Sequence, residues 1–203
     1  MWWIGCTGVW VKTENDTNLA VDLWFGNGKR TQKKKYMDEY HQMANMTGGR
    51  LTQPNLRAAP VVYDPFAVTK VDAVLATHYH NDHIDPFFAA AVLKNCKPDV
   101  PFIGPKESVK KWLSYGVPEE RCKVVKPGDV LHIGDSEITV LDSFDRTCLV
   151  TADGDIRHTC LDNLDDKAVN YLIKTPAGTV YHSGDSHYSV YYAKHGKDYD
   201  IDV

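Results

Sequence analysis

Residues 77–85, Thr-His-Tyr-His-Asn-Asp-His-Ile-Asp, limit both the fold and the chemistry open to this chain. The preceding residues, 71–77, form a short apolar run bounded by charge, which predicts a buried strand that ends where the histidines begin. In an extended chain, residues i and i+2 point the same way. His78 and His80 are therefore expected to project into one cavity.

Beyond His80 the chain is predicted to turn at Asn81, so that Asp82 and His83 lie on the following loop. We therefore assign His78 and His80 to one metal ion, and Asp82 with His83 to a neighbouring ion. Imidazole together with carboxylate suits zinc, manganese, iron or cobalt better than calcium. A histidine-rich surface turn is the alternative, but the strand before the motif and the H-x-H-x-D-H spacing favour metal binding.

Size and charge narrow the class of protein. The length of 203 residues predicts a single domain over residues 1–203, and both ends look abrupt, so we expect a domain truncated at both ends. The net charge of −4 gives no general attraction to nucleic acid or to anionic membranes. No apolar run approaches the ~20 residues of a membrane span, and no signal peptide is visible.

The cysteines form no recognisable pattern. There are five, without a C-x-x-C pair: Cys6, Cys96, Cys122, Cys148 and Cys160. An odd, scattered set argues for reduced thiols, and so for a cytoplasmic location.

The order of the predicted elements indicates the fold class. Strands are expected at residues 2–12, 17–25, 71–77, 100–103, 122–125, 130–133, 137–141, 169–174 and 179–182. Helices are expected at residues 35–46, 86–95, 106–115 and 189–194, with Asp85 as the N-cap of the second, Gly196 ending the last, and an exposed loop at 151–167. Strands followed by a mixture of helices and strands are typical of an α/β (α+β) protein, as in an αββα sandwich.

Two later stretches, 141–146 and 181–187, are predicted to place acids at strand ends. Two cations a few ångströms apart need a shared anionic ligand, and a carboxylate bridges well. Asp185 follows a flexible glycine and is predicted to be this bridge, although alone it would be interpreted as a turn aspartate. Asp142 and Asp145 compete for one further ligand position.

Other polar side chains near these stretches are expected to have supporting roles. His182 is predicted to orient a ligand. His187 either faces the substrate or faces the solvent. Asp22, inside the predicted strand 17–25, is expected to be a solvated or hydrogen-bonded carboxylate rather than a ligand.

Together these motifs resemble the L-ascorbate-6-phosphate lactonases, members of the metallo-β-lactamase superfamily with an RNase-like variant of its αββα sandwich. The H-x-H-x-D-H run looks like the superfamily signature without substitution. The more particular likeness covers nearly the whole chain. It is carried by residues 1–8, 53–57, 64–67, 76–85, 101–105, 125–129, 144–147 and 181–189.

The resemblance implies a Mn²⁺-dependent hydrolase, with two ions per complete site, that opens the lactone ring of L-ascorbate 6-phosphate to give 3-keto-L-gulonate 6-phosphate. It also implies a homo-oligomer. The superfamily usually has a histidine where this chain has Asp142 or Asp145; the register favours Asp145, and an acid there favours Mn²⁺ over Zn²⁺. Family members also begin earlier and continue past residue 203, to a late histidine that completes the second metal.

The resemblance also implies a mechanism, in which metal-activated water attacks the lactone carbonyl. Asp82 would orient this nucleophile and pass its proton to the leaving enolate oxygen. Arg57 and Arg146 are candidates for binding the phosphate, although either could instead pair with a structural carboxylate. Two rival functions are a phosphodiesterase or ribonuclease of the same fold, which the acidic balance disfavours, and an inactive metal-binding fragment.

Overall fold

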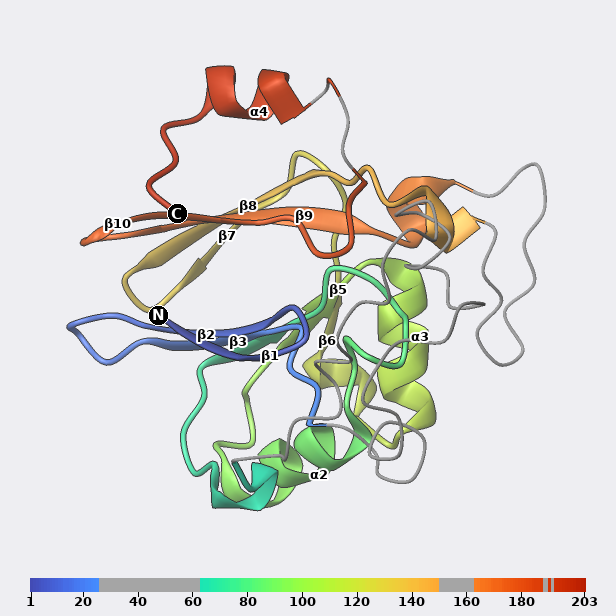
Figure 1. Ribbon diagram of the computed structural model, residues 1–203. Coiled ribbons are helices and arrows are strands. Elements are labelled where there is room, and N and C mark those ends of the chain that lie inside the picture. Colours follow the sequence, from blue (N-terminus) through green and yellow to red (C-terminus); the bar gives the residue numbers. More distant parts are fainter. Residues whose placement is uncertain (26–62, 150–162, 188–189, 191) are drawn as a thin grey trace, which may run out of the picture.

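The computed structural model describes residues 1–25, 63–149, 163–187, 190 and 192–203, without the side chains of Arg146 and Thr147. The predicted helix 35–46, the candidate Arg57 and most of the predicted loop 151–167 lie outside the described residues. Two sheets lie face to face, with helices against their outer faces (Figure 1).

The first sheet has six strands in the order β1-β2-β3-β4-β5-β6. They are β1 (Trp2–Gly5), β2 (Gly8–Lys12), β3 (Asn18–Val21), β4 (Ala73–Leu75), β5 (Phe102–Gly104) and β6 (Cys122–Val124). The first three pair antiparallel, whereas β3 to β6 run parallel. Parallel strands are buried on both faces, which explains why β4 is apolar throughout. Their carboxyl ends meet at one edge, where ligands bind in open α/β sheets.

The second sheet has four strands in the order β10-β9-β8-β7, all antiparallel. They are β7 (Val130–Ile133), β8 (Ser136–Asp142), β9 (Val169–Thr175) and β10 (Gly178–His182). The loops after β8 and β10 leave this sheet toward the carboxyl end of β4, where His78 pairs with Ala168 in an isolated bridge. The ends of the two sheets are therefore joined at the place where the histidine motif begins.

Helices complete the predicted αββα arrangement. Helices α2 (Pro86–Asn95) and α3 (Lys106–Ser114) lie against the first sheet, and α4 (Tyr192–Asp198) lies over the second (Figure 1). Short 3₁₀ helices are η2 (Pro65–Ala67), η3 (Glu119–Arg121), η4 (Arg146–Leu149) and η5 (Leu164–Asp166). One apolar core packs α2 and α3 against the first sheet, and a second core lies between the two sheets.

The start of α2 follows the predicted capping chemistry. Oδ1 of Asp85 accepts hydrogen bonds from the N–H groups of Phe87 and Phe88, at 2.8 and 2.9 Å, and Pro86 is the first helical residue. The other carboxylate oxygen accepts from the N–H of Phe25 at 3.0 Å. Asp85 therefore caps α2, as predicted, and it also joins the end of the histidine motif to the segment after β3.

Three predicted boundaries are wrong. The strand expected over 2–12 is a hairpin of β1 and β2, because Gly5 (φ 119°) and Cys6 (φ 50°) form a tight turn that the apolar pattern did not reveal. The strand expected over 17–25 ends at Val21, since Asp22 has a φ of 51°. Gly196 does not stop the last helix but lies inside α4.

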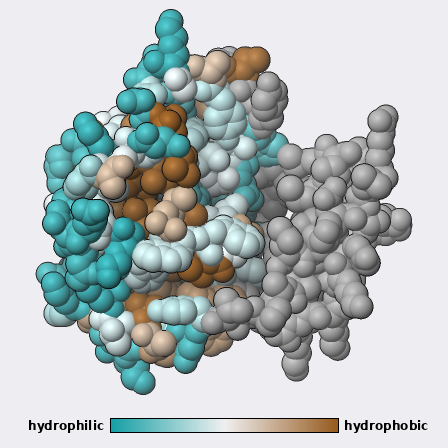
Figure 2. All heavy atoms as spheres, turned by 60° about the vertical axis from the view of Figure 1, so that its left-hand side comes forward, coloured by the Kyte–Doolittle hydropathy of each residue, from teal (hydrophilic) through white to brown (hydrophobic). Residues whose placement is uncertain are grey.

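The described surface has apolar regions away from the histidines. Hydrophobic side chains reach the surface between hydrophilic margins on the face drawn in Figure 2. A hollow of about 450 Å³ is lined by aromatic residues that include Trp2, Trp10, Phe25 and Tyr63. Within the described part of the chain, no helix combines the length and the apolar character needed to cross a bilayer.

Candidate metal centre

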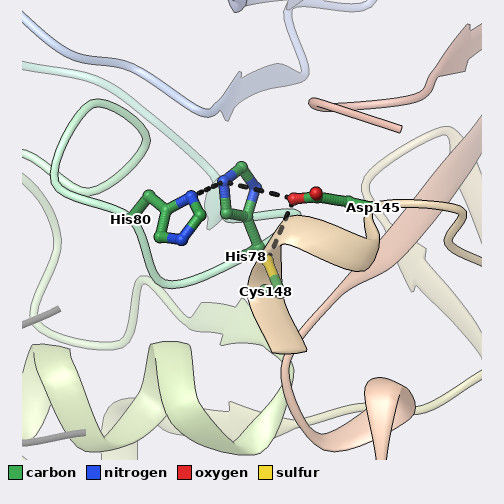
Figure 3. A group of neighbouring side chains, drawn as sticks. All are labelled: His78, His80, Asp145 and Cys148. Atoms are coloured by element: carbon green, nitrogen blue, oxygen red, sulfur yellow. Dashed lines mark hydrogen bonds and ion pairs between the residues drawn. The ribbon is translucent and has the colours of Figure 1, made fainter. Parts of the chain in front are cut away.

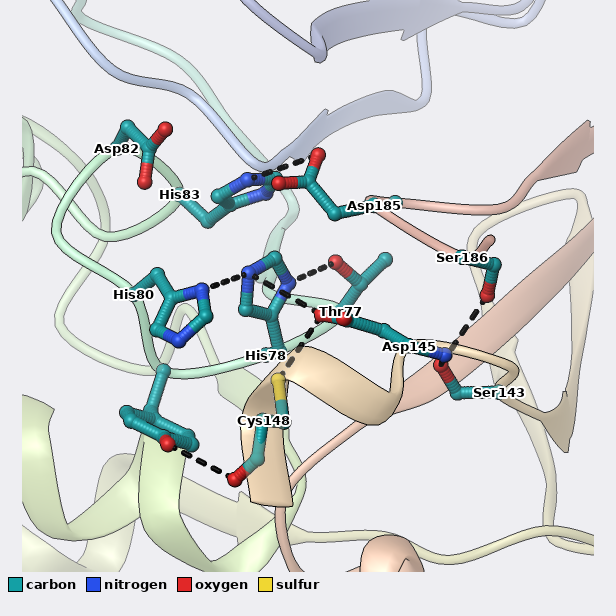
Figure 4. Close-up of polar contacts among 12 residues, drawn as sticks. Thr77, His78, His80, Asp82, His83, Ser143, Asp145, Cys148, Asp185 and Ser186 are labelled. Carbon is teal, nitrogen blue, oxygen red and sulfur yellow. Dashed lines mark hydrogen bonds and ion pairs between the residues drawn. The ribbon is translucent and has the colours of Figure 1, made fainter. Parts of the chain in front are cut away.

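Donor side chains converge where the parallel strands end (Figure 4). The first donor group contains His78, His80, Asp145 and Cys148, and the second donor group contains His78, His83 and Asp185. Within each group, one donor atom from every residue lies within 4.8 Å of the others. Because His78 belongs to both groups, the structure offers two neighbouring positions for a cation.

The backbone and the ring of His78 are both held in place. The bridge to Ala168 is reinforced by the N–H of Val169, which donates to the carbonyl of Thr77 at 2.8 Å. The Thr77 hydroxyl donates to Asp22 at 2.6 Å and lies 3.1 Å from Nδ1 of His78, from which it can accept. This arrangement places the proton of His78 on Nδ1 and leaves Nε2 as a lone-pair donor.

His78 and His80 face each other, as their i, i+2 spacing predicts. Nε2 of His78 lies 2.9 Å from Nδ1 of His80 and 3.8 Å from Oδ2 of Asp145 (Figure 3). Burial lowers the pKa of His78, and the nearby imidazoles of His83 and His80 lower it further. The neutral ring is the form that binds a metal. Nitrogen ligands of a tetrahedral site with bonds of about 2.0–2.1 Å lie roughly 3.3 Å apart, so small shifts would admit an ion.

A buried carboxylate orients His83. Nδ1 of His83 lies 2.9 Å from Oδ2 of Asp22 and 3.1 Å from the hydroxyl of Thr7. Burial lowers the pKa of His83, but the carboxylates of Asp22 and Asp185 outweigh it and raise that pKa to about 10. Nδ1 of His83 therefore donates to Asp22, and Nε2 faces the second donor group. The sequence predicted a solvated or hydrogen-bonded Asp22. The carboxylate is fully buried and hydrogen-bonded, to Thr77 and His83, and the sequence gave no sign of the contact with His83.

The surroundings of Nε2 of His83 indicate whether a metal ion fits the second donor group. This buried nitrogen makes no hydrogen bond with any described residue, and it lies 3.4 Å from Oδ1 of Asp185, long for a charge-assisted hydrogen bond. The raised pKa of His83 means that, without an ion, a proton on Nε2 faces the Asp185 carboxylate. A divalent cation would take the place of that proton, because a histidine ligand must be neutral. With His78 in the same donor group, the arrangement fits a divalent cation held by imidazole and carboxylate.

Asp185 reaches the site on a turn that only glycine can form. Gly184 has a φ of 51°, and a Cβ there would lie 2.4 Å from Oγ1 of Thr77. Glycine tolerates both the left-handed backbone and the close approach. The turn thereby sets Asp185 beside His78 and His83, a position from which a carboxylate could be shared between two ions.

His182 uses both ring nitrogens within the protein. Its Nε2 donates to the carbonyl of Thr7 at 2.8 Å, and its Nδ1 accepts from the N–H of Gly184 at 3.3 Å. In this arrangement His182 has no lone pair for an ion. It holds the Asp185 turn against the β1–β2 hairpin, in keeping with the orienting role expected from the sequence.

The loop after β8 brings Asp145, rather than Asp142, into the site. Asp142 is the exposed last residue of β8, whereas the side chain of Asp145 is 1% exposed. The N–H of Asp145 donates to the hydroxyl of Ser143 at 3.1 Å, and the hydroxyl of Ser186 lies 3.2 Å from that of Ser143. Ser186 therefore connects this loop to the turn after β10.

Two predicted site residues lie at the margin. Asp82 belongs to neither donor group of the described residues, and its Oδ2 lies 3.8 Å from the sulfur of Cys6. Nδ1 of His187 lies 3.8 Å from Oδ1 of Asp145, and its side chain is 29% exposed. His187 is thus placed between the site and the solvent. The side chains of Arg57 and Arg146 lie outside the described structure.

Cys148 is the donor that sequence reasoning missed. Its sulfur is completely buried and lies 3.0 Å from Oδ2 of Asp145. Burial, followed by the charge of Asp145, raises the pKa of the Cys148 thiol. Without a C-x-x-C pattern the residue gave no signal on its own. Its spacing of three from Asp145 was the available clue, because residues i and i+3 of a 3₁₀ turn lie on one side.

Comparison with known protein families agrees with this architecture. The family model described as the Beta-lactamase superfamily domain matches residues 17–194. The chain belongs to this superfamily. The two-sheet fold and the two donor groups support a divalent metal at the edge of the first sheet.

Relatives within the superfamily are close in sequence. Proteins named "Probable L-ascorbate-6-phosphate lactonase UlaG" from Escherichia coli (strain SMS-3-5 / SECEC) and from Shigella boydii serotype 18 are each 58% identical over 205 residues. Each match covers 100% of this chain and 58% of the relative. The chain therefore spans little more than half the length of these curated relatives.

Solved structures with low sequence identity share the fold. CmlA, a diiron β-hydroxylase from Streptomyces venezuelae, is 16% identical with a TM-score of 0.57, covering 96% of this chain and 31% of CmlA. An isothiocyanate hydrolase from Delia radicum gut bacteria is 18% identical with a TM-score of 0.56, covering 94% of this chain and 64% of that chain. At such identities the likeness is one of architecture, which confirms the predicted fold class.

Proposed function

We propose that the protein is a metal-dependent hydrolase that opens the lactone ring of L-ascorbate 6-phosphate, giving 3-keto-L-gulonate 6-phosphate during anaerobic use of ascorbate. The observation that carries the proposal is the 58% identity, over the whole chain, to proteins named for this lactonase activity. The convergence of imidazoles and carboxylates at one sheet edge supplies chemistry that suits the reaction.

The proposed ligands follow the two donor groups. His78, His80 and Asp145 would hold one ion, and His83 would hold the other, with Asp185 shared between them. A pair of divalent ions, when bound, lowers the pKa of a coordinated water from 15.7 toward about 7 and polarises a carbonyl oxygen.

Asp82 is the proposed proton carrier. It lies on the loop between His80 and His83 but outside both donor groups, so its carboxylate can accept a proton while the other side chains hold cations. It would take the proton from the attacking water and deliver it to the ring oxygen as the carbon–oxygen bond breaks. The sequence also assigns Asp82 to the second ion, and that role requires its side chain to turn toward His83.

Further features of the proposal concern the substrate, the metal and the assembly. Arg57 and Arg146 are the candidates for gripping the phosphate, because a guanidinium matches phosphate oxygens well. We propose Mn²⁺ as the metal, with Zn²⁺ as the alternative, and a homo-oligomer in the cytoplasm. Four cysteines of the described chain, Cys6, Cys96, Cys122 and Cys148, are free thiols, which suits a reducing compartment.

The test is lactone opening by the purified protein with added Mn²⁺ or Zn²⁺, followed by the loss of L-ascorbate 6-phosphate. Asp82→Ala should lower kcat by roughly 10²–10⁴-fold, the usual contribution of a positioned acid–base group. Asp99→Ala, at an exposed position before β5, is the matched control and should leave kcat unchanged. Undiminished turnover in Asp82→Ala would remove Asp82 from the mechanism, and no lactone opening with either metal would overturn the proposed function.

A further inference from the structure

We propose that Cys148 is a thiolate ligand, so that the ion in the first donor group is held by two imidazoles, one carboxylate and one sulfur. The inference concerns the metal centre on which the proposed function rests. It goes beyond the sequence prediction, which gave this ion His78, His80 and Asp145 with Asp185 shared between the two ions. In the arrangement proposed here, Cys148 is the fourth ligand of the first ion and Asp185 is left to the second. It also changes which metal that position should prefer.

Two donor atoms lie near one carboxylate oxygen, and a third lies beside one of them. Oδ2 of Asp145 lies 3.0 Å from the sulfur of Cys148 and 3.8 Å from Nε2 of His78. Nε2 of His78 in turn lies 2.9 Å from Nδ1 of His80. Figure 3 shows the four side chains next to one another, with His78 between His80 and Asp145, and one donor atom of each lies within 4.8 Å of the others. Small shifts of these side chains would let a single ion bind all four, because donor atoms in a zinc site lie about 2.0–2.3 Å from the metal.

The position of Cys148 is fixed rather than incidental. Cys148 lies in η4, the 3₁₀ helix that begins directly after Asp145. The carbonyl of Cys148 accepts a hydrogen bond from the hydroxyl of Tyr79 at 3.0 Å. Tyr79 is completely buried and packs with Cys148 and Ala168 in a small apolar cluster. This contact joins the histidine loop to η4, so the sulfur is held on the same side as the imidazoles.

Charge balance favours a thiolate at this depth. The side chains of His78 and Asp145 are each 1% exposed, and Cys148 is fully buried. A divalent ion with only one carboxylate would leave net positive charge in a buried place, which is costly. A carboxylate and a thiolate together neutralise the ion. On binding, the thiol loses its proton to the solvent and sulfur forms the bond to the metal, so one proton is released for each ion bound.

The two positions should then differ in the ions they accept. Four protein donors with one thiolate are typical of a closed, tightly held zinc site, whereas a catalytic site keeps a position open for water. A soft thiolate also favours Zn²⁺ over Mn²⁺. With His78 bound to the first ion, the second donor group offers the imidazole of His83 and the carboxylate of Asp185, whose side chain is 40% exposed. It is the position suited to a harder ion and to an exchangeable water.

A simpler role for the thiol makes a different prediction. If Cys148 only donates a hydrogen bond to Asp145, then serine, which also donates, should replace it with little loss. A thiolate ligand has no such substitute, because a neutral hydroxyl is a poor ligand for zinc. Cys148→Ser therefore separates the two roles.

The decisive experiment loads the metal-free protein with Co²⁺ and records the near-ultraviolet charge-transfer absorption that a cobalt–thiolate bond produces. We expect this band in the unaltered protein, its loss in Cys148→Ser and in Cys148→Ala, and its retention in Cys6→Ser. Cys6 is the matched control, because its sulfur lies beside the site, 3.8 Å from Asp82. Absence of the band in the unaltered protein, or its survival in Cys148→Ser, overturns the proposal whether or not the alanine variant folds.

A second measurement compares metal affinities by titration. Cys148→Ser should lower Zn²⁺ affinity by roughly tenfold or more, at least the loss seen for an orienting partner, and should lower Mn²⁺ affinity less. Equal losses for the two metals contradict the thiolate. The outcome is separate from the lactonase proposal: a protein with the band but no lactone opening retains the thiolate ligand, whereas an active protein without the band loses only this inference.

Discussion

The two sheets support the metal centre in different ways. The first supplies its imidazoles from one loop after β4, held by Asp22, a fully buried carboxylate. The second supplies its acids from two separate loops, held by neutral hydroxyl and amide groups of Ser143, Ser186 and Asn170. Hydrogen bonds to charged groups contribute about 1.5–3 kcal/mol, against about 0.5–1.5 kcal/mol for neutral ones. The imidazole half of the site (His78, His80 and His83) should therefore depend more strongly on its supporting hydrogen bonds than the carboxylate half (Asp145 and Asp185).

The largest effect is expected from Asp22→Asn. The asparagine amide can donate to Nδ1 of His83, so that Nδ1 gives up its proton while Nε2 keeps its own and has no lone pair for a metal ion. Losing such an orienting partner typically costs 10–100-fold in metal affinity, and we expect a loss in this range when the purified variant is titrated with Mn²⁺ or Zn²⁺.

A matched control for that change is Asp135→Asn. Asp135 also accepts side-chain hydrogen bonds, from Thr13 at 2.9 Å and Asn15 at 2.9 Å, but these lie on the β2–β3 turn away from the donors. Its metal affinity should stay unchanged. If both variants lose affinity equally, Asp22 acts through general stability and the contrast between the two halves fails.

Gly184→Ala tests the junction between the halves. Alanine must adopt a φ near 51° and must push against Oγ1 of Thr77, which we expect to cost about 1–3 kcal/mol. For a protein of this size, each kcal/mol shifts the melting temperature by about 2–4 °C, so thermal unfolding should begin several degrees lower. Metal affinity should fall as well, because Asp185 moves away from His83.

Gly196→Ala serves as the comparison for that variant. Gly196 lies within α4, and a Cβ there would meet nothing within 4 Å. Alanine in a helix interior is favoured over glycine by about 0.5–1 kcal/mol, so this variant should melt at a slightly higher temperature. A lower melting temperature for Gly196→Ala than for Gly184→Ala would show that the close approach at Thr77 is unimportant.

Ser186→Ala should have a smaller effect on the carboxylate half. The hydroxyl accepts from the N–H of Phe144 at 2.9 Å and donates to Oδ1 of Asn170 at 2.9 Å. Removing these neutral bonds should cost about 1 kcal/mol of unfolding free energy and lower metal affinity less than Asp22→Asn does. Denaturant unfolding measures the first quantity, with Ser114→Ala on the exposed side of α3 as control. A larger loss of affinity than in Asp22→Asn reverses the comparison.

The same contrast explains what the sequence could predict. The imidazole half is contiguous, so spacing and a preceding apolar strand were enough to bring His78 and His80 together. The carboxylate half depends on how loops more than 35 residues apart meet, and the choice between Asp142 and Asp145 needed the folded loop. Cys148 and the link from Asp22 to His83 arise from packing between sheets, for which local sequence carries no pattern.

Fold prediction succeeded and failed for related reasons. The αββα order and the cap of α2 at Asp85 follow from local signals, namely apolar runs and a capping side chain before proline. The turn at Cys6 was missed because a positive φ is uncommon at residues other than glycine. Gly196 was interpreted as a helix stop, but helix propensity is a weak guide where tertiary contacts hold the segment, as the ring contacts of His195 do for α4.

The smallest effect should come from His195, where the neutral network of the second sheet reaches α4. Asn170 donates to the hydroxyl of Tyr181 at 2.9 Å, so that hydroxyl donates in turn to Nδ1 of His195 at 2.8 Å. Burial lowers the pKa of His195. The stability that its neutral ring contributes is therefore fully present above the unfolded pKa of about 6.5 and is lost as the pH falls through the lower folded pKa.

His195→Gln keeps an acceptor for Tyr181 but does not titrate. Thermal unfolding from about pH 8 to about pH 5 should show the unaltered protein losing stability relative to this variant only below about pH 6.5. If the difference in melting temperature between the two proteins stays constant over this range, the titration of His195 does not contribute to stability. His195 would then not belong to the network that supports the acids.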